Sequence, residues 1–328
     1  MVATATIPGL SDVQSPATAD EAWLLVAAIA SVLIVASLLG QLLRIRVARR
    51  APHAAIDNLN SRINAWWAIA FLLGLALYGG RTGVCLLFGF ASLAALHEFV
   101  SAGAPQAGSR PLWIGSGCLL MVALQYLCVW SANYLAFATL LPLLACLPLL
   151  AVPSARGRVW LASTRRLCAG LLICVFSVSH LPALLTLLPD GAAVGWRRLV
   201  FLLLVVQASD VLQYLWGKLA GRHLITPRLS PSKTVEGTVG GILSACALGA
   251  MLSSLTPFTR LQAILISLLL TLLGFAGGLL LSAVKRRRGI KDWGSVIPGH
   301  GGVLDRLDSL FLPAPAFYYL LRYGWTTE

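Results

Sequence analysis

Long apolar stretches with few charged side chains recur along almost the whole of this 328-residue chain. Among the clearest are residues 22–43, 112–130, 134–152 and 261–284. A helix that crosses the hydrocarbon core of a bilayer needs about 20 mostly apolar residues. Only 11% of all residues are charged, whereas soluble domains carry about 25%. The sequence therefore predicts an integral membrane protein and excludes a water-soluble fold.

The apolar stretches predict an all-α, polytopic integral membrane protein with about ten transmembrane helices. We expect these helices at residues 22–43, 64–79, 83–102, 112–130, 134–152, 167–189, 198–217, 237–256, 261–284 and 307–323. A polar N-terminal tail, residues 1–21, precedes them. The helices divide into an N-terminal region, 22–197, with few embedded ionisable groups, and a C-terminal region, 198–328, that carries most of the polar motifs.

Lys and Arg are unevenly distributed between the loops on the two sides of these helices. If the N-terminus lies outside, the inside loops hold 20 of the 25 Lys and Arg residues. Cytoplasmic loops carry the excess of positive charge in membrane proteins. The bias predicts a multi-pass protein of the cell inner membrane whose net charge of +13 concentrates on the cytoplasmic face. That face would attract anionic lipids and substrates, and nothing indicates binding of nucleic acid.

One carboxylate lies inside a predicted span, in the stretch Q-A-S-D-V-L-Q-Y-L-W-G-K that begins at residue 207. An Asp at the centre of a bilayer costs about 3 kcal/mol on insertion scales, so Asp210 indicates a functional site or an ion pair between helices. At helical spacing, one face of this helix carries Asp210, Gln213, Tyr214, Gly217 and Lys218. The face leads toward the cytoplasmic end of the helix.

The following loop, residues 222–241, reads R-H-L-I-T-P-R-L-S-P-S-K-T-V-E-G-T-V-G-G. Ser230, Lys233 and Thr234 place two hydroxyls and an ammonium close together. These groups suit a phosphate, because Lys supplies charge and the hydroxyls supply directional hydrogen bonds. The spacing is not that of a Walker A loop, and a solvated basic loop is the alternative.

The most informative stretch, residues 282–308, reads S-A-V-K-R-R-R-G-I-K-D-W-G-S-V-I-P-G-H-G-G-V-L-D-R-L-D. Gly301 and Gly302 let the backbone approach a ligand closely. They precede a predicted helix whose N-terminus favours anions. Asp305 and Asp308 are three residues apart, on one helical face where they could hold Mg²⁺.

These 27 residues resemble the phosphatidate cytidylyltransferase pattern S-x-x-K-R-x-x-x-x-K-D-x-[GSA]-x-x-[LIF]-[PG]-x-H-G-G-x-x-D-R-x-D at every defined position. Upstream, S-D-V-L-Q-Y-L-W-G-K and L-S-P-S-K-T-V-E-G are similar to that family's S-D-x-x-A-Y-x-x-G-[KR] and S-P-x-K-T-x-E-G. Within residues 57–102, N-L-N-S-R-I-N-A-W-W and L-H-E-F resemble a longer bacterial branch of the family. The resemblance is specific over about 198–310, and residues 103–197 match only as helices.

The resemblance implies a Mg²⁺-dependent enzyme that transfers CMP from CTP to phosphatidic acid, giving CDP-diacylglycerol and pyrophosphate in phospholipid biosynthesis. Its partners would be CTP, phosphatidic acid or a related lipid phosphate, and membrane lipids. The expected catalytic residues are Asp210, Asp305, Lys233, Lys291 and Arg306. The expected substrate-binding residues are Lys218, Ser230, Thr234, Lys285, Arg286, His300, Gly301 and Gly302. Mg²⁺ is expected on Asp210, Asp305 and Asp308.

The chain departs from the family pattern just before the Lys-Arg pair. Many bacterial members have G-D-L-x-E-S there, whereas residues 277–282 read G-G-L-L-L-S. Gly278 thus replaces an Asp that helps to hold catalytic metal, and Leu281 replaces the Glu. Eukaryotic members also carry Gly-Gly at this place, so activity is still expected, but a two-metal arrangement is in question. Gln213 stands where the family usually has Ala.

Three alternatives remain open. The same transfer could use another lipid phosphate, such as a polyprenyl phosphate, which a panel of lipid acceptors would reveal. The chain could bind CTP or lipid without turnover, because Gly278 replaces the metal Asp. A transporter would need ionisable residues along a midplane path, whereas here they cluster at one face.

Two features outside the motifs complete the expectations. His97 and Glu98, near the inside end of the third predicted span, could approach the site, but we favour a pair that reaches out to the membrane interface. Gly-rich faces at 237–241 and 274–278 would allow close helix contacts, including those of a homodimer.

Overall fold

The computed structural model describes residues 19–47, 54–102, 112–150, 157–187, 192–227, 229–296 and 301–324. The predicted polar tail, 1–21, lies almost wholly outside the described residues, and so does His300.

Helices make up nearly all of the described chain. The N-terminal region holds α1 (Ala19–Val47), α2 (Ala54–Tyr78), α3 (Gly80–Ser101), α4 (Leu112–Trp130) and α5 (Tyr134–Leu150). A further run of helix joins α6 (Gly157–Gly170), the π-helical η1 (Leu171–Ser177), α7 (Val178–Ala183) and the 3-10 turn η2 (Leu184–Thr186). The C-terminal region holds α8 (Ala192–Ala220), α9 (Val235–Met251), the turn η3 (Ser253–Leu255), α10 (Arg260–Arg287), α11 (Leu304–Leu307) and α12 (Pro313–Gly324).

Within the described residues, the β-sheet consists of one small antiparallel hairpin. Its strands β1 (Leu224–Thr226) and β2 (Ser230–Thr234) connect α8 to α9. The rest of the described chain is helical or connects helices, so the predicted all-α class is confirmed.

Six helical segments of the described chain are long and apolar enough to cross a membrane: Trp23–Arg46, Leu59–Tyr78, Gly80–Ser101, Ser163–Thr186, Gly195–Ala220 and Arg260–Arg287. Three shorter apolar helices, Ser116–Trp130, Tyr134–Cys146 and Val235–Met251, also coincide with predicted spans. The protein is therefore a multi-pass membrane protein, as predicted.

The predicted tenth span, 307–323, is not one helix. Its first part is divided between α11 and a turn, and α12 begins only at Pro313. Proline suits the first turn of a helix because it lacks the N–H that a helix interior would need. The 12 residues of α12 extend about 18 Å, which is less than the ~30 Å hydrocarbon core. The number of ten spans is thus not confirmed.

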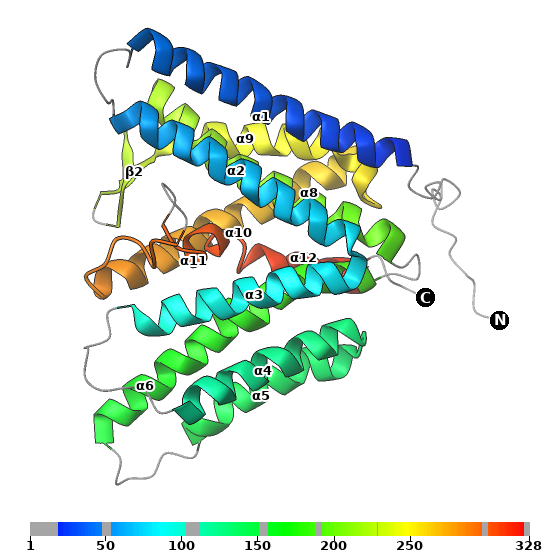
Figure 1. The fold of residues 1–328 in the computed structure, drawn as a ribbon, viewed down its shortest axis with the longest axis vertical. Coiled ribbons are helices and arrows are strands. Elements are labelled where there is room, and N and C mark those ends of the chain that lie inside the picture. Colours follow the sequence, from blue (N-terminus) through cyan, green and yellow to red (C-terminus); the bar gives the residue numbers. More distant parts are fainter. Residues whose placement is uncertain are drawn as a thin grey trace, which may run out of the picture.

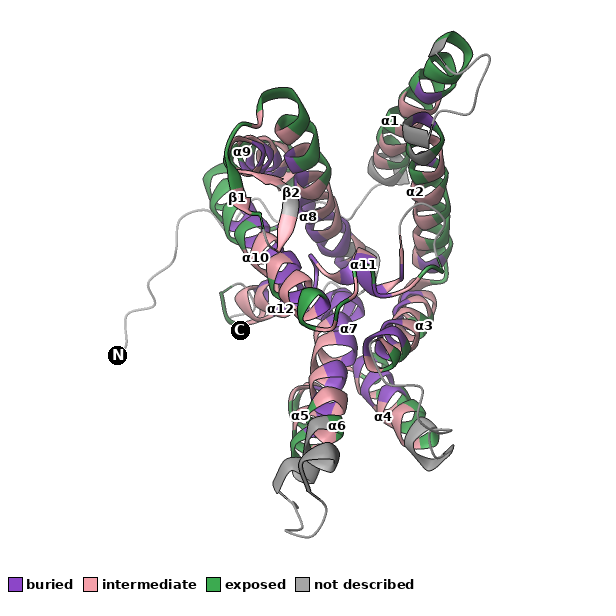
Figure 2. Ribbon diagram, turned by 90° about the vertical axis from the view of Figure 1, so that its left-hand side faces the viewer, coloured by how far each residue is buried: buried purple, intermediate pink, exposed green. Residues whose placement is uncertain are grey.

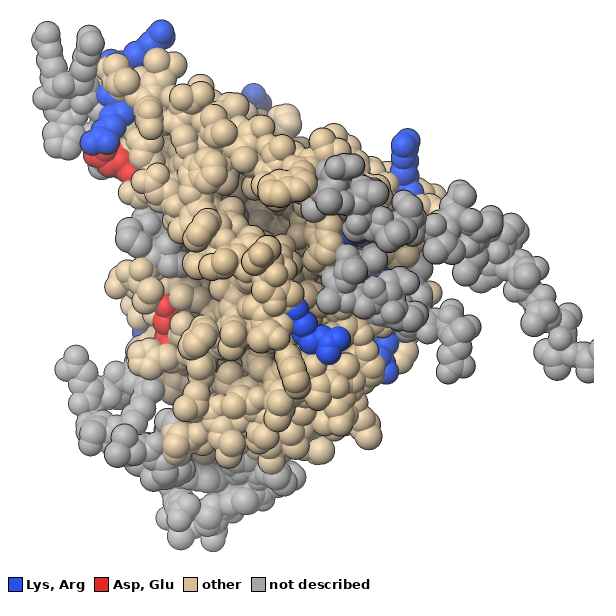
Figure 3. Space-filling model, turned by 45° about the vertical axis from the view of Figure 1, so that its right-hand side comes forward, with Lys and Arg blue, Asp and Glu red and all other residues tan. Residues whose placement is uncertain are grey.

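The helices differ strongly in how far they are buried. Figure 2 shows α1 and α2 standing to one side, with buried residues gathered around α7, α11 and α12 in the middle. Only 6% of the α1 span is buried, against 72% of Ser163–Thr186. The broad, nearly uncharged surface in Figure 3 is what lipid-facing helices require.

The glycine-rich faces pack within the chain. A Cβ at Gly241 would lie 2.4 Å from the side chain of Gln213 on α8, so α8 and α9 touch almost backbone to backbone. A Cβ at Gly277 on α10 would lie 3.0 Å from the carbonyl oxygen of Asp308. Both faces thus serve contacts within one chain, and the predicted homodimer stays a prediction.

Candidate active site

Three sequence motifs meet at one end of the molecule. Figure 1 shows the β2 hairpin, the end of α10 and α11 on the same side, where α1 and α3 also end. Asp210 comes from α8, Lys233 from β2 and Lys285 from the last turn of α10. The structure therefore brings together motifs that are separated by up to about 100 residues in the sequence.

The hairpin that carries Lys233 is closed by Glu236. Its carboxylate accepts hydrogen bonds from the backbone N–H of Arg222 (3.0 Å) and of His223 (3.2 Å) and pairs with His223 Nδ1 (2.5 Å). The Arg222 bond first and the His223 ring second lower the pKa of Glu236 to about 2. The carboxylate is therefore ionised, and the hairpin closed, at neutral pH.

Thr234 has a structural role that the sequence did not predict. Its Oγ1 accepts a hydrogen bond from Gly237 N (3.1 Å), so Thr234 is the N-cap of α9. A Cβ at Gly221 would lie 2.7 Å from the same oxygen. The expected contact of Thr234 with a phosphate stays a prediction.

The ammonium of Lys233 lies beside α10. It is 4.5 Å from the centroid of the Phe275 ring and 3.6 Å from where a Cβ of Gly278 would stand. It also acts electrostatically on Asp210. The position at which bacterial relatives are expected to carry an Asp is thus occupied here by a glycine next to a cation.

Asp210 and Asp308 form the acidic part of the site. Asp210 is hydrogen-bonded to the side chain of Ser309 and lies within electrostatic range of Lys233 and Arg306. Asp308 lies within range of Asp210 and is 3.7 Å from Lys285 Nζ. Two carboxylates are thus surrounded by three cationic groups.

Asp305 holds the loop after α10, whereas its motif suggested a ligand for Mg²⁺. Its Oδ1 accepts from Lys285 Nζ (2.8 Å), and its Oδ2 accepts from Trp293 N (2.9 Å) and Gly302 N (2.9 Å). Side-chain exposure is 5% for Asp305 and 10% for Lys285. Both oxygens are therefore occupied by the loop that Asp305 organises, and the expected Mg²⁺ contact of Asp305 is not supported.

Glu98 reaches the same loop from α3. Its two oxygens accept from Val303 N and Leu304 N, each at 2.9 Å, and only 6% of the residue is exposed. The interfacial pair that we favoured for His97 and Glu98 is therefore wrong, because Glu98 is buried beneath the loop and only His97 is exposed. The sequence signal was a carboxylate near the end of an apolar span.

The predicted anion site at the start of α11 is also already filled. Glu98 takes the N–H groups of Val303 and Leu304, and Asp305 takes that of Gly302. Gly301 has a φ of +82°, which a side chain would strain, so its role is to turn the loop. The expected contact of the Gly302 N–H with phosphate is therefore not supported, and that of Gly301 stays a prediction.

The remaining predicted cations lie nearer the surface. Arg286 donates to the carbonyl oxygens of Leu229 and Ile290, each at 3.3 Å, and so ties the hairpin to the loop. Lys291 and Lys218 are exposed, and Ser230 is half-buried in β2. These side chains are available to a ligand that approaches from this end.

Arg62 on α2 was missed by the sequence reasoning. Its guanidinium lies 5.8 Å from the centroid of the Tyr214 ring, as does the ammonium of Lys218. It is also close enough to influence Arg306 electrostatically. Arg62 belongs to the stretch N-L-N-S-R-I-N, whose resemblance to the longer bacterial branch was the available signal.

The acidic residues allow a test of the expected Mg²⁺. Within the described residues, no group of three His, Cys, Asp or Glu side chains could hold a metal ion. Mg²⁺ is usually bound through one or two carboxylates together with substrate phosphates. Asp210 and Asp308 fit such a site, because they are neighbouring carboxylates whose oxygens are not taken up by backbone N–H groups of the described loop.

Comparison with known proteins assigns the chain to a family. The model of the "Cytidylyltransferase family" matches residues 60–324. The chain belongs to the cytidylyltransferase family. This match runs from residue 60, within α2, to the end of α12 and so includes every residue assigned to the site.

Individual relatives of this cytidylyltransferase differ in how much of it they cover. It is 34% identical over 301 residues to "Uncharacterized protein YnbB" of Escherichia coli (strain K12), covering 89% of this chain and 96% of that protein. It is 35% identical over 150 residues to a phosphatidate cytidylyltransferase of Staphylococcus saprophyticus, covering 45% of this chain and 58% of the relative. For the phosphatidate cytidylyltransferase of Bacillus subtilis (strain 168), identity is 39% over 129 residues, covering 39% and 48%. The chain thus spans about half the length of these two relatives.

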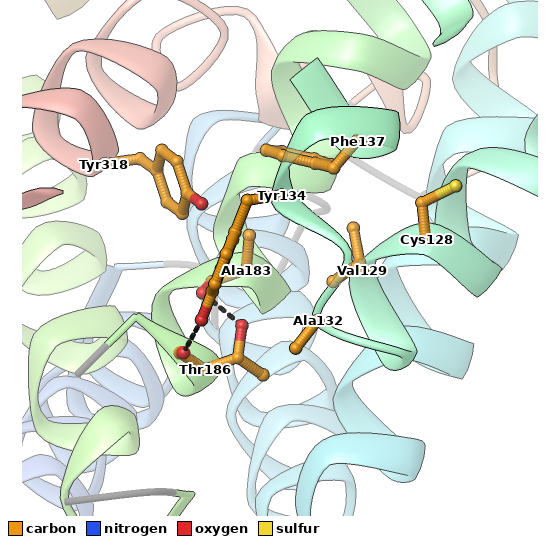
Figure 4. A pocket seen from close by; sticks show the side chains of 8 residues that line it. All are labelled: Cys128, Val129, Ala132, Tyr134, Phe137, Ala183, Thr186 and Tyr318. Carbon is orange, nitrogen blue, oxygen red and sulfur yellow. Dashed lines mark hydrogen bonds between the residues drawn. The ribbon is translucent and has the colours of Figure 1, made fainter. Parts of the chain in front are cut away.

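A small hollow lies away from the site. Figure 4 shows it between the turn from α4 to α5, the end of α7 and Tyr318 of α12. Thr186 Oγ1 donates to the carbonyl of Ala183 there (3.0 Å), and Tyr134 donates to Thr186. None of its lining residues belongs to a motif of the cytidylyltransferase site, so we give it no role in the chemistry.

Proposed function

We propose that this protein transfers CMP from CTP to phosphatidic acid at the cytoplasmic face of the inner membrane, giving CDP-diacylglycerol and pyrophosphate. One observation carries the proposal. Asp210, Asp308, Lys233, Lys285 and Arg306, drawn from three separate motifs, meet at one end of a bundle of apolar helices. The names of the Staphylococcus and Bacillus relatives support the choice of acceptor.

In the proposed reaction, an oxygen of the lipid phosphate forms a bond to the α-phosphorus of CTP. The bond from that phosphorus to the bridging oxygen of pyrophosphate breaks, and pyrophosphate leaves with the electron pair. A lipid phosphate is already ionised at pH 7, so no side chain is needed as a general base. The reaction then depends mainly on positioning and on neutralising charge.

The chain's own residues meet these demands. Lys233 and Arg306 lie beside Asp210 and can neutralise phosphate oxygens. Arg62 and Lys218, each 5.8 Å from the centroid of the Tyr214 ring, are suited to a second anionic group. The exposed apolar residues of α2 lead to them along the bilayer. Asp210 and Asp308 would hold Mg²⁺, which when bound supplies charge neutralisation at the phosphates.

The test uses the full-length protein in mild detergent with labelled CTP, phosphatidic acid and Mg²⁺. We expect CDP-diacylglycerol from the wild type, roughly a 100-fold or greater loss for Asp210→Asn, and normal turnover for Asp57→Asn. Asp57 is an exposed carboxylate in the first turn of α2. Normal turnover by Asp210→Asn would contradict the site assignment.

A second acceptor class has one observation in its favour. The alignment with YnbB covers nearly the whole of both chains, whereas the alignments with the two named cytidylyltransferases cover about half of each. The same chemistry would then act on another lipid phosphate. A panel of acceptors that includes polyprenyl phosphate separates the two, because the preferred acceptor has the higher kcat/KM.

A further inference from the structure

The carboxylate of Glu98 connects the N-terminal region to the catalytic loop. Glu98 lies in the last turn of α3, and its hydrogen-bond partners Val303 and Leu304 are 205 and 206 residues further along the chain. Both oxygens are used, one for each N–H, and the residue is 6% exposed. A buried carboxylate is stable only while such bonds are intact.

The loop is shaped to fit this carboxylate. A Cβ at Gly294 would lie 2.7 Å from Glu98 Oε1, and a Cβ at Gly302 would lie 2.4 Å from Oε2. No larger residue fits at either position without displacing the carboxylate. The neighbouring Phe99 ring contacts Trp293 (5.1 Å between centroids) and the guanidinium of Arg288 (4.3 Å to the ring centroid). The end of α3 is therefore the surface on which the segments 288–296 and 301–304 rest.

A second carboxylate, Asp305, holds the same loop. Asp305 accepts from Trp293 N and Gly302 N, next to the residues that Glu98 contacts. Asp305, Arg306 and Asp308 follow Leu304 directly in α11 and the turn after it. A shift of the N–H groups of Val303 and Leu304 would thus move Arg306 and Asp308 with them.

We infer that Glu98 is a positioning residue for the transfer reaction: it fixes the start of α11 and so sets where Arg306 and Asp308 lie. The inference rests on the proposed function for its kinetic consequence, but its structural consequence does not depend on turnover. Glu98 itself touches neither substrate, because the loop covers it.

The first test compares Glu98→Gln with His97→Gln, an adjacent and exposed control. The glutamine amide has only one acceptor oxygen. Its NH₂ group would face one of the two backbone N–H groups and could not accept a hydrogen bond from it. We expect kcat to fall by roughly 100-fold, as a small displacement of catalytic groups can do, with a much smaller change in the KM for CTP. Amide exchange over residues 293–296 and 301–304 should become faster in Glu98→Gln, while other segments and the His97→Gln protein stay as in the wild type.

A second test covers the case in which Glu98→Gln loosens the whole protein. Gly294→Ala should lower kcat in the wild-type background, because the added Cβ collides with the carboxylate. In Glu98→Ala the space is empty, so adding Gly294→Ala should change kcat little further. Strong non-additivity in this cycle supports the inference. Additive effects, or normal kcat and loop exchange in Glu98→Gln, would overturn it.

The two proposals fail in different ways. A wild type without any transfer of CMP to lipid would contradict the proposed function, while the exchange experiment would still decide the role of Glu98. An active wild type whose Glu98→Gln variant is equally active would contradict the role of Glu98 alone.

Discussion

Two aspartates of one motif, Asp305 and Asp308, do different work. In the sequence they are equivalent candidates for a metal, since both lie on one face of a short helix. In the structure the oxygens of Asp305 accept hydrogen bonds from Lys285 and from two backbone N–H groups. Asp308 instead lies within electrostatic range of Asp210, Lys285 and Arg306. We therefore expect Asp305 to stabilise the loop directly and to affect the transfer reaction only through the position of that loop.

Asp305→Asn should lower both stability and activity. The amide cannot pair with the buried ammonium of Lys285, and breaking a buried ion pair costs about 3–5 kcal/mol. We expect the midpoint of thermal unfolding in detergent to fall by roughly 5 °C or more. Asp210→Asn serves as the comparison, because it should remove activity with little change in the midpoint. Equal midpoints for the two variants would show that Asp305 does not organise the loop.

At the scale of elements, the glycine face of α10 decides how closely the catalytic turn can approach. Gly274 and Gly277 lie under the carbonyl oxygens of Ser309 and Asp308, at 3.1 and 3.0 Å from where a Cβ would stand. Gly278 meets only Lys233 Nζ, at 3.6 Å, which is ordinary contact. Neighbouring glycines on one helix thus have different tolerances.

Gly277→Ala and Gly278→Ala form a matched pair. We expect Gly277→Ala to lower kcat by roughly 10-fold, because the added methyl displaces the turn at Asp308 by a few tenths of an ångström. Gly278→Ala should keep normal activity and gain up to about 1 kcal/mol from the better helix propensity of alanine. The measurements are steady-state turnover and thermal unfolding. If Gly278→Ala lost activity while Gly277→Ala kept it, the conclusion that a methyl group at position 278 makes only ordinary contact with Lys233 would be wrong.

The hairpin gives a pH prediction at the same scale. Because the pKa of Glu236 is lowered to about 2, its contribution is complete above the ordinary pKa of about 4.5 and is lost as the pH falls toward 2. Between pH 5 and 8 the Glu236 carboxylate should therefore stay ionised, so its own titration should add no step to the activity profile. The variant should be less active at every pH in that range, since its amide cannot accept from Arg222, His223 N and the His223 ring together. Equal activity of the wild type and the variant across that range would contradict this.

For the whole molecule, the arrangement of loops predicts sidedness in the membrane. The β2 hairpin and the segment after α10 lie at one end in Figure 1, and the turn between α4 and α5 lies at the other. The first end carries the concentration of Lys and Arg, which favours the cytoplasmic side.

Cysteine labelling tests this orientation. Ser295 and Ser131 are exposed residues at the two ends. A membrane-impermeant thiol reagent should label Ser131→Cys in intact cells, and Ser295→Cys only in inverted vesicles. The parent protein gives the background, since its seven free cysteines all lie within helices. The opposite pattern would place the site outside the cytoplasm.

The sequence alone determined the membrane class, most of the apolar helices and the motifs that supply the candidate site. The length of an apolar stretch and the spacing of a motif depend only on residues close together in the chain, so both can be recognised in the sequence without the fold. Only the tertiary structure decided that Glu98 lies beneath the catalytic loop, that Arg62 joins the site and that Asp305 serves the loop. Each of these depends on hydrogen bonds or charge contacts between residues that the fold brings together from distant parts of the chain. No local pattern specifies which buried donor a carboxylate will meet.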